Sequence, residues 1–269
     1  MLKNTRFKLI FKQLYLADES KIKKINPKID VPIIATDNIA SKEQANLSTR
    51  LNTYKLRLQP APLVKQEPES NSIINTITDN TDFGVIFDKM QSCTLCDLCN
   101  SRQNVIIERG NRAARVMIVG DYPTHDDDNY GYPFAAANGE LLDKMIQAMQ
   151  LDVTKDVYIT NLIKCKPKAN LEPTQTQINL CKNYLFSQIK HVKPIVIIAL
   201  GRFAGQVLLN NSLSIKDMRN KINYYNDIPV IVSYSVETIK RASVDVKYFE
   251  YKKATWEDLQ LAMQIIGKR

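Results

Sequence analysis

The segment Arg115–Gly120, with the sequence RVMIVG, decides the fold of this chain. Its run of apolar residues, ended by a glycine, predicts a short strand that is buried on both faces of a sheet. The same kind of segment returns further along the chain, at Val157–Asn161 (VYITN), Ile195–Gly201 (IVIIALG) and Pro229–Val232 (PVIV). We therefore expect four inner strands.

Helical segments alternate with these strands. We expect helices over four ranges: Leu141–Met149, Thr174–Lys190, Arg202–Leu209 and Thr255–Ile266. Thr174 carries the hydroxyl of a typical N-cap. Strands and helices that alternate in this way predict an α/β fold of three layers, α/β/α, around a central, mainly parallel four-stranded sheet. In that architecture the functional loops follow the carboxyl ends of the strands, which here are Gly120, Thr160, Leu200 and Val232.

The amino-terminal part of the chain differs in composition from the rest. Residues 21–80 are rich in Lys, Asn, Ser, Thr, Pro and Gln and have no sustained helical period, so we expect residues 1–82 to be a mostly disordered tail before a globular domain at 83–269. The exception is a short amphipathic helix near 5–16, whose apolar face is formed by Phe7, Ile10, Phe11, Leu14 and Tyr15. Such a helix on a tether either docks into a groove of a partner protein or packs on its own domain.

Charge and hydropathy narrow the class of protein. The net charge of +9 favours a polyanionic partner such as nucleic acid, although a lysine-rich surface would also account for it. We recognise neither a secretory signal nor an apolar run of about 18 residues that could span a membrane. We therefore expect a cytoplasmic protein with no membrane contact, whose thiols stay reduced.

Four of the five cysteines follow a pattern typical of a metal site. Cys93 and Cys96 form a C-x2-C pair, and Cys165 and Cys181 follow much later in the chain. Two close and two distant cysteines can supply four thiolates that tie separate parts of one fold together. The spacing suits zinc and an iron–sulfur cluster equally, and scattered structural cysteines are the alternative. Cys99 extends the pair and is either a spare thiol or an alternative ligand.

Several short motifs follow one another in a fixed order. They are GDYPT at 120–124, DDD at 126–128, GYPF at 131–134, NGELL at 138–142, YITNLIKC at 158–165 and LG at 200–201 followed by Ala204. This ordered set resembles the iron–sulfur uracil-DNA glycosylases of bacteria and archaea, often called family 4, over nearly the whole predicted globular part. The resemblance implies a [4Fe–4S] cluster on Cys93, Cys96, Cys165 and Cys181, with Cys99 outside the ligand set.

The same resemblance implies a pocket for a flipped base. A uracil inside a duplex cannot be attacked until the enzyme extrudes it. Phe134 matches the aromatic residue that stacks on the base, and Asn161 matches the amide that donates to and accepts from its edge. Tyr122 stands where the family has a small residue, and its ring would fill the pocket or shield the attacking water. Without the resemblance, Phe134 and Asn161 would be interpreted as a core aromatic and a turn residue.

This chain departs from the family pattern at the catalytic positions. Asp121 replaces a glutamate that is one methylene longer, and Ser235 stands where the family has a histidine that stabilises the departing uracil anion. Neither His125, in the first loop, nor His191, at a helix end, matches that histidine, although His125 is the candidate to replace it. In the loop before the fourth strand, Asn220 replaces a glycine. Loss of one oxyanion donor typically costs about 100- to 1000-fold in rate.

Two functions are therefore expected. The first is a DNA-binding uracil-DNA glycosylase-like protein that hydrolyses the N-glycosidic bond of flipped uracil in DNA repair, in single- or double-stranded DNA, with weak activity. The alternative is a non-catalytic repair or replication module on the same fold, docked to a partner through the amino-terminal helix.

Overall fold

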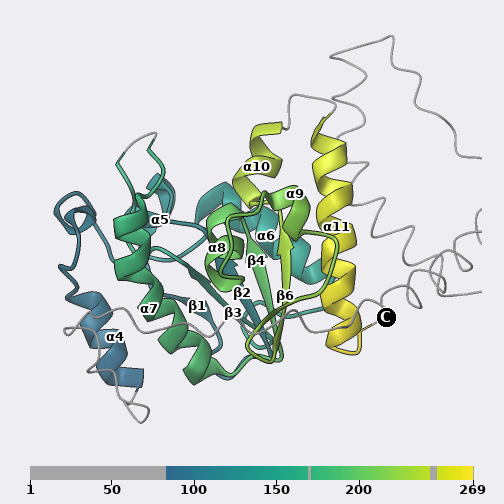
Figure 1. The fold of residues 1–269 in the computed structure, drawn as a ribbon, viewed down its shortest axis with the longest axis horizontal. Coiled ribbons are helices and arrows are strands. Elements are labelled where there is room, and N and C mark those ends of the chain that lie inside the picture. Colours follow the sequence, from purple (N-terminus) through teal and green to yellow (C-terminus); the bar gives the residue numbers. More distant parts are fainter. Residues whose placement is uncertain (1–82, 169–170, 243–246, 269) are drawn as a thin grey trace, which may run out of the picture. The chain divides into compact units, whose positions relative to one another are not determined.

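The computed structural model describes residues 83–168, 171–242 and 247–268 (Figure 1). The expected disordered tail at 1–82 and its helix near 5–16 lie outside the described residues. In the described ranges the helices are either too short or too polar to span a bilayer.

The described residues form a six-stranded sheet in the order β1-β3-β2-β4-β6-β5. The strands are β1 (Arg109–Gly110), β2 (Val116–Gly120), β3 (Val157–Asn161), β4 (Val196–Leu200), β5 (Asn223–Tyr225) and β6 (Ile228–Ser233). The inner strands β3, β2, β4 and β6 run parallel, while β1 and β5 pair antiparallel at the two edges. The expected four strands are all present, but the strand count was wrong, because strands as short as β1 and β5 are too brief to show a period in the sequence.

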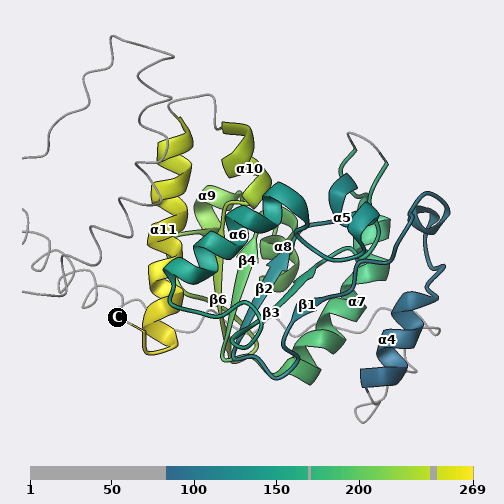
Figure 2. The ribbon, with the colours of Figure 1, turned by 180° about the vertical axis from the view of Figure 1, so that it is seen from behind.

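Helices cover both faces of the sheet (Figures 1 and 2). They are α4 (Phe83–Gln91), the 3-10 helix η1 (Asp97–Asn100), α5 (His125–Tyr130), α6 (Ala136–Ala148), α7 (Gln175–Val192), α8 (Arg202–Leu208), α9 (Ile215–Met218), α10 (Val236–Arg241) and α11 (Lys247–Ile265). One core cluster joins the sheet to α6, α10 and α11, and a second joins its other face to α7, α8 and α9. The predicted three-layer α/β/α class is confirmed.

The continuous apolar strands explain this double cover. Val116 and Ile118 of β2 belong to the core on the α6 face, whereas Met117 and Val119 belong to the core on the α7 face. Successive side chains of a strand point to opposite faces, so a strand that is apolar throughout must be buried on both.

The start of α7 agrees with the sequence prediction, whereas α6 and α11 begin earlier than predicted. Thr174 caps α7 as predicted: its Oγ1 accepts from the Gln177 amide at 3.2 Å, and the Gln177 side chain accepts from the Thr174 amide at 2.9 Å. Helices α6 and α11 begin before the predicted Leu141 and Thr255. The first turn of α6 carries small or polar residues with no apolar period. The start of α11, KYFEYKKA, does contain aromatic residues, and the prediction passed over them.

The order of the strands opens a crevice above the sheet. After β2 the chain continues to β3 on one side of β2, whereas β4 lies on the other side of β2 and is followed in the sheet by β6. The loops that follow β2 and β4 therefore diverge at the carboxyl ends of these strands. In open α/β sheets this reversal point is where ligands bind.

Candidate active site

A cavity of about 360 Å3 lies at the carboxyl ends of the inner strands. Its lining includes residues from each of the four predicted loops, those that follow β2, β3, β4 and β6. The structure brings all five predicted pocket residues to this lining: Asp121, Tyr122, Phe134, Asn161 and Ser235. Their proximity is a feature of the fold, while their roles stay predictions.

Phe134 and Asn161 meet at Gly120, the last residue of β2. A Cβ on Gly120 would lie 2.6 Å from Phe134 Cζ and would also overlap with Asn161 Oδ1, so only glycine leaves room for both side chains. Asn161 is 1% exposed, and its Nδ2 has no hydrogen-bond partner within the described part of the chain. A buried donor without a partner typically costs about 1–3 kcal/mol. Its presence in a cavity indicates a ligand that accepts the bond.

The backbone of Phe134 is held in a conformation that bulky residues rarely adopt. Its φ is 54°, in the left-handed region. The buried carboxylate of Asp127 accepts from the Ala135 amide at 2.6 Å and from the Thr124 amide at 2.8 Å, while Gly139 leaves no space for a Cβ beside the Phe134 carbonyl. Strain of this kind persists only where the surroundings impose it, and it is typical of functional sites.

Asp127 is thus a site residue that the sequence interpretation missed. The sequence analysis noted it only as part of the acidic motif DDD at 126–128. The detectable signal was the capping box of Thr124 and Asp127 at the start of α5, which indicates a carboxylate that turns back toward the loop.

The Asp121 carboxylate is bound by the first amides of α8. Its Oδ1 accepts from the Ala204 amide at 2.8 Å, and the amides of Arg202 and Phe203 also hydrogen-bond to the carboxylate. Gly201, with φ 135°, has no room for a Cβ beside this carboxylate. Burial raises the pKa of Asp121 to about 7, and the three amides only partly oppose that rise. Asp121 therefore stands at the cavity as a carboxyl group whose lone pairs are largely engaged.

Ser235 is the N-cap of α10. Its Oγ accepts from the Thr238 amide at 3.1 Å and lies 2.9 Å from Thr238 Oγ1. The hydroxyl therefore serves the helix rather than the cavity.

Neither of the chain's two histidines, both described by the structure, lines the cavity. His125 is exposed, and its Nε2 lies 3.1 Å from Asn129 Nδ2. His191 stacks on Phe83, with ring centroids 4.2 Å apart. The interpretation of His125 as a replacement donor receives no support from this geometry, because its exposed ring does not line the cavity.

Glu237 is a second cavity residue that the sequence interpretation passed over. Burial raises the pKa of its carboxyl group, with a smaller opposing effect from Arg241 and a further rise from the charge of Asp127. The pKa of Tyr122 is likewise raised by burial and then by the charge of Glu237. The cavity lining therefore includes four carboxyl groups, those of Asp121, Asp127, Glu172 and Glu237. Glu172 pairs with Arg202 at 2.8 Å, and Glu237 has no hydrogen bond to a backbone amide among the bonds described here.

The cavity lining also combines basic groups with aromatic rings, and two of the basic groups pair with lining glutamates, Arg202 with Glu172 and Arg241 with Glu237. Arg202, Lys216 and Arg241 contribute to its lining. The Arg202 guanidinium lies 4.2 Å from the ring centroid of Phe203, and the rings of Phe203 and Tyr122 are 6.3 Å apart. Basic groups beside aromatic faces are typical of surfaces that bind single-stranded or extruded nucleotides.

Asn220 lies in the segment between α9 and β5. Asn220, which replaces a glycine, has φ 57°, and asparagine tolerates this left-handed conformation better than most residues do. Asp258 accepts from the Asn220 amide at 2.8 Å, from Ser233 Oγ at 2.6 Å and from Arg219 Nε at 3.1 Å. Through these bonds α11 anchors the turn that leads to Ser235.

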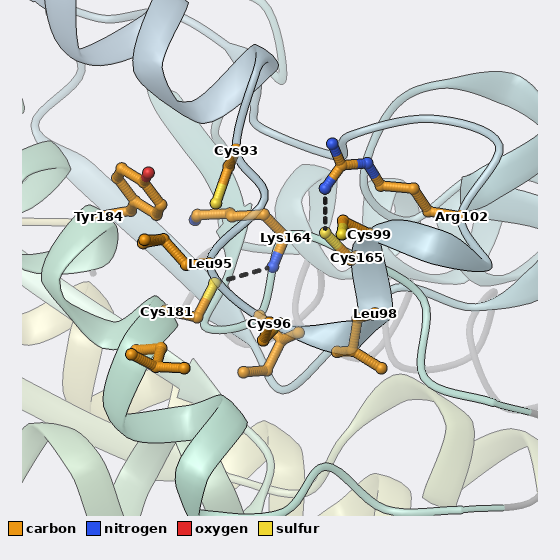
Figure 3. A pocket seen from close by; sticks show the side chains of 12 residues that line it. Cys93, Leu95, Cys96, Leu98, Cys99, Arg102, Lys164, Cys165, Cys181 and Tyr184 are labelled. Atoms are coloured by element: carbon orange, nitrogen blue, oxygen red, sulfur yellow. Dashed lines mark hydrogen bonds between the residues drawn. The ribbon is translucent and has the colours of Figure 1, made fainter.

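The cysteine side chains gather around a second, smaller cavity (Figure 3). It is lined by all five: Cys93 after α4, Cys96 and Cys99 around η1, Cys165 after β3, and Cys181 in α7. Arg102 Nη1 donates to Cys165 Sγ at 3.1 Å, and the Lys164 amide donates to Cys181 Sγ at 3.4 Å. Burial raises the pKa of Cys181 to about 12 and also raises that of Cys165.

The arrangement of the sulfurs tests which group they can hold. In the described ranges no three His, Cys, Asp or Glu side chains converge as they would around one metal ion. A single zinc needs four ligands at about 2.3 Å from one point. In an iron–sulfur cluster each thiolate binds its own iron, so the sulfurs need only surround a shared cavity. The five cysteines in the lining and the N–H donors to two of their sulfurs fit a cluster better than a zinc ion.

Comparisons with known proteins now bear on this site. The model of the uracil DNA glycosylase superfamily matches residues 107–260, which include every predicted pocket residue. The type-4 uracil-DNA glycosylase of Thermotoga maritima is 30% identical over 186 residues, 68% of this chain and 94% of that protein. The chain belongs to the type-4 uracil-DNA glycosylase family.

Further type-4 relatives support this membership. The protein of Archaeoglobus fulgidus is 40% identical over 125 residues, 46% of this chain and 62% of the relative. That of Saccharolobus solfataricus is 36% identical over 152 residues, 55% of this chain and 69% of the relative. The alignment with the Archaeoglobus fulgidus protein thus spans about three fifths of that relative. The family resemblance that the ordered motifs indicated is confirmed.

Proposed function

We propose that this type-4 family member binds uracil flipped out of DNA and hydrolyses its N-glycosidic bond in DNA repair, at a low rate. The observation that carries the proposal is the buried Nδ2 of Asn161, which has no partner among the described residues and lies beside Phe134 in a cavity at the carboxyl ends of the strands.

This pair of side chains has the chemistry needed to select uracil. The Phe134 ring offers a face on which a flat base can stack. The Asn161 amide can donate from Nδ2 to a uracil carbonyl oxygen and accept at Oδ1 from the uracil ring N–H. Cytosine carries an amino group in place of one carbonyl, so that a donor would face a donor. An unpaired buried polar group would then disfavour cytosine.

The catalytic groups support turnover only weakly. The reaction breaks the bond between the sugar C1′ and the base nitrogen, forms a bond from water oxygen to C1′, and leaves the electron pair on uracil. Asp121 can orient the water or accept its proton once the carboxyl group is ionised, but three backbone amides already bind it. The Ser235 hydroxyl is engaged in capping α10, and no histidine lines the cavity to stabilise the uracil anion. We expect a rate about 100- to 1000-fold below that of an enzyme with a full set of donors.

The thiol cavity is proposed to hold a [4Fe–4S] cluster on Cys93, Cys96, Cys165 and Cys181. When bound, such a cluster supplies four covalent cross-links between distant segments, and its binding energy adds to the stability of the fold. In this chain the ligands would tie the segment after α4 and the segment after β3 to α7. Cys99 lines the same cavity and is proposed to be a free thiol.

A second candidate function is a non-catalytic DNA-binding module. The observation that favours it is that both proposed catalytic side chains, Asp121 and Ser235, accept hydrogen bonds from the first turns of helices. A partner would dock through the amino-terminal helix expected near 5–16, which lies outside the described residues.

Incubation of the purified protein with uracil-containing oligonucleotides decides between these functions. Abasic sites are revealed by alkaline cleavage of single- and double-stranded substrates under single-turnover conditions, with oligonucleotides that carry cytosine or thymine at the same position as controls. We expect slow release of uracil that Asn161→Ala abolishes. DNA binding with no abasic product, in wild type and variant alike, would support the non-catalytic module instead.

A further inference from the structure

Lys164 is a fully buried lysine that follows β3 and lies between the two cavities. It is 2% exposed. Its Nζ donates to Thr160 Oγ1 at 2.7 Å, to the Asn161 carbonyl oxygen at 2.5 Å and to Gln188 Oε1 at 2.6 Å. All three ammonium donors are therefore used, and their three acceptors are uncharged oxygens.

Burial of an ammonium group without a bonded carboxylate is costly. Taking it out of water costs several kcal/mol, which neutral acceptors only partly offset. An apolar side chain of similar length would fill the same volume without that cost. The hydrogen bonds of Lys164 therefore require an explanation beyond packing.

The main chain on either side of Lys164 links the cavities. Its amide donates to Cys181 Sγ at 3.4 Å, its carbonyl accepts from the Ile106 amide at 2.7 Å, and the next residue is Cys165. Figure 3 shows Lys164 among the cysteine side chains. From there its side chain reaches back to the carbonyl oxygen of Asn161, the last residue of β3.

The hydrogen bond from Lys164 Nζ to the Asn161 carbonyl oxygen affects the orientation of the Asn161 side chain. The Asn161 Nδ2 has no protein partner in the described ranges, so that end of the amide is not anchored by a hydrogen bond. Its direction therefore depends strongly on the peptide group of Asn161, whose oxygen Lys164 holds. The following amides, those of Leu162 and Ile163, bond to the β2 strand end at Gly120 and Asp121, at 2.8 and 3.1 Å. The Asn161 peptide is thus fixed from both sides.

We propose that Lys164 is a positioning residue, which sets the orientation of Asn161 for base binding. Its main chain contacts Cys181 and precedes Cys165, so Lys164 also connects the thiol cavity to the base cavity. This inference rests on the proposed function, because it assigns Lys164 to the same base-binding site. It predicts that loss of the Lys164 ammonium group weakens uracil binding and leaves general DNA binding unchanged.

Gln188 supplies a matched control for the test. Its Oε1 accepts from Lys164, while its Nε2 donates to Tyr158 Oη at 2.7 Å and to the Ile107 carbonyl at 3.2 Å. Gln188 is fully buried in the same network but does not line the base cavity. Gln188→Leu therefore removes polar contacts from the same network and leaves the bond from Lys164 to Asn161 in place.

The experiment compares Lys164→Met and Gln188→Leu in the full chain, purified without air. Affinity for free uracil is measured by ligand-observed NMR, affinity for uracil-free DNA by fluorescence anisotropy, and iron content by colorimetry. We expect Lys164→Met to lose about tenfold or more in uracil affinity, equivalent to about 1.4 kcal/mol, with DNA affinity within about twofold of wild type. Gln188→Leu should lower the melting temperature and lose no more than about threefold in uracil affinity, because it also removes one of the three acceptors of the ammonium group.

Three results would overturn the inference. If the Lys164→Met variant binds uracil as tightly as wild type does, the ammonium group does not position Asn161. Equal losses in Lys164→Met and Gln188→Leu would show a general effect of core damage. Wild-type protein that binds DNA and holds its fold but does not bind uracil would overturn the proposed function itself, and the inference with it.

A milder variant keeps the test available if Lys164→Met does not fold. Thr160→Val is nearly isosteric and removes one of the three acceptors of the ammonium group. We expect a smaller loss of uracil affinity, about threefold, in keeping with the loss of one neutral hydrogen bond. Uracil affinity equal to that of wild type in Thr160→Val would contradict the proposal.

Discussion

At the scale of single residues, Asp121 shows how a backbone contact changes the chemistry of a carboxyl group. The carboxylate lies against the first amides of α8, and burial raises its pKa to about 7 even though those amides favour the charged form. Gly201 makes the approach possible because any Cβ there would overlap with the carboxylate. Asp121, which stands where the family pattern has a glutamate, therefore also caps the start of α8.

Asp121→Asn should change how stability depends on pH. The ordinary pKa of the unfolded carboxyl group is 3.8 and the folded value is about 7, so the native state keeps a proton that the unfolded state releases. The stabilisation is fully present below about pH 4 and is lost as pH rises through 7. We expect Asp121→Asn to lose this pH dependence and to be the more stable protein at pH 8. The gain is at most about 4 kcal/mol, less where cavity water screens the charge.

Urea unfolding at several pH values between 4 and 8 measures this effect. Asp227→Asn, an exchange at an exposed turn, is the control and should keep the pH dependence of wild type. A pH dependence that persists in Asp121→Asn would assign it to another buried carboxyl group, of which Glu237 is the first to examine, because burial raises its pKa as well.

Restoring the missing catalytic groups should raise the excision rate. In the double variant Tyr122→Gly with Ser235→His, the histidine supplies a donor for the departing uracil and the glycine opens space for water. We expect a rise of about tenfold or more in single-turnover excision. The histidine also removes the N-cap of α10, at a cost of about 1 kcal/mol in stability.

Matched variants separate catalysis from capping in this experiment. Tyr122→Gly with Ser235→Ala loses the same cap without gaining a donor, so its excision rate should stay low. Asn161→Ala added to the restored variant should abolish activity. If the restored variant remains inert while DNA binding is intact, the non-catalytic module becomes the better description.

At the scale of elements, short loops and helix starts build the site, and α7 is the element that joins it to the thiol cavity. Thr174 caps the start of this helix, as the sequence predicted, and Cys181 lies about two turns later on the thiol side. Gln188, further along the same helix, reaches Lys164 beneath the base cavity. A group bound to Cys181 therefore acts on the same helix that supports the base pocket.

Removal of a cluster ligand should loosen this arrangement. We expect Cys165→Ala to lose iron and to melt at a lower temperature, because metal ligation contributes to folding and because Arg102 loses its Sγ partner. Cys99→Ala should keep iron and stability. Protein purified without air is assayed for iron and sulfide, for brown absorbance and by thermal unfolding. Stoichiometric zinc without iron would overturn the cluster assignment.

At the scale of the whole molecule, the net charge of +9 favours binding to DNA. The affinity of residues 83–269 for DNA should fall steeply as salt rises, because bound phosphates release counterions. Deletion of residues 1–82 should leave folding intact, because that segment has too little periodic apolar content to share a core.

Single charges should contribute to this salt dependence according to their position. We expect Lys216→Ala and Arg241→Ala each to lower the slope of log K against log salt by about 1. Lys155→Ala is the control: this side chain is 79% exposed but precedes β3, at the opposite end of the strand from the cavity. Equal effects of all three variants on the slope would show that DNA does not bind at the cavity mouth.

The sequence by itself determined the layers of this protein and most of its pocket. Apolar runs such as Val116–Gly120 must be buried on both faces, so the alternation of strands and helices was enough to predict the architecture and the four loops above it. Phe134 and Asn161 were found because the ordered motifs resemble those of a known family. These signals are local along the chain, or repeat along it, and so are visible without coordinates.

Only the tertiary structure decided what the polar side chains do. It placed the carboxylate of Asp121 against α8 and the hydroxyl of Ser235 on α10. It also left His125 outside the cavity lining and revealed Asp127, Glu237 and Lys164. Each of these outcomes depends on contacts between segments far apart in the chain, or on a backbone conformation such as the left-handed Phe134 that its neighbours impose. The energy of a buried polar group depends on which partners surround it, and those partners come together only when the chain folds.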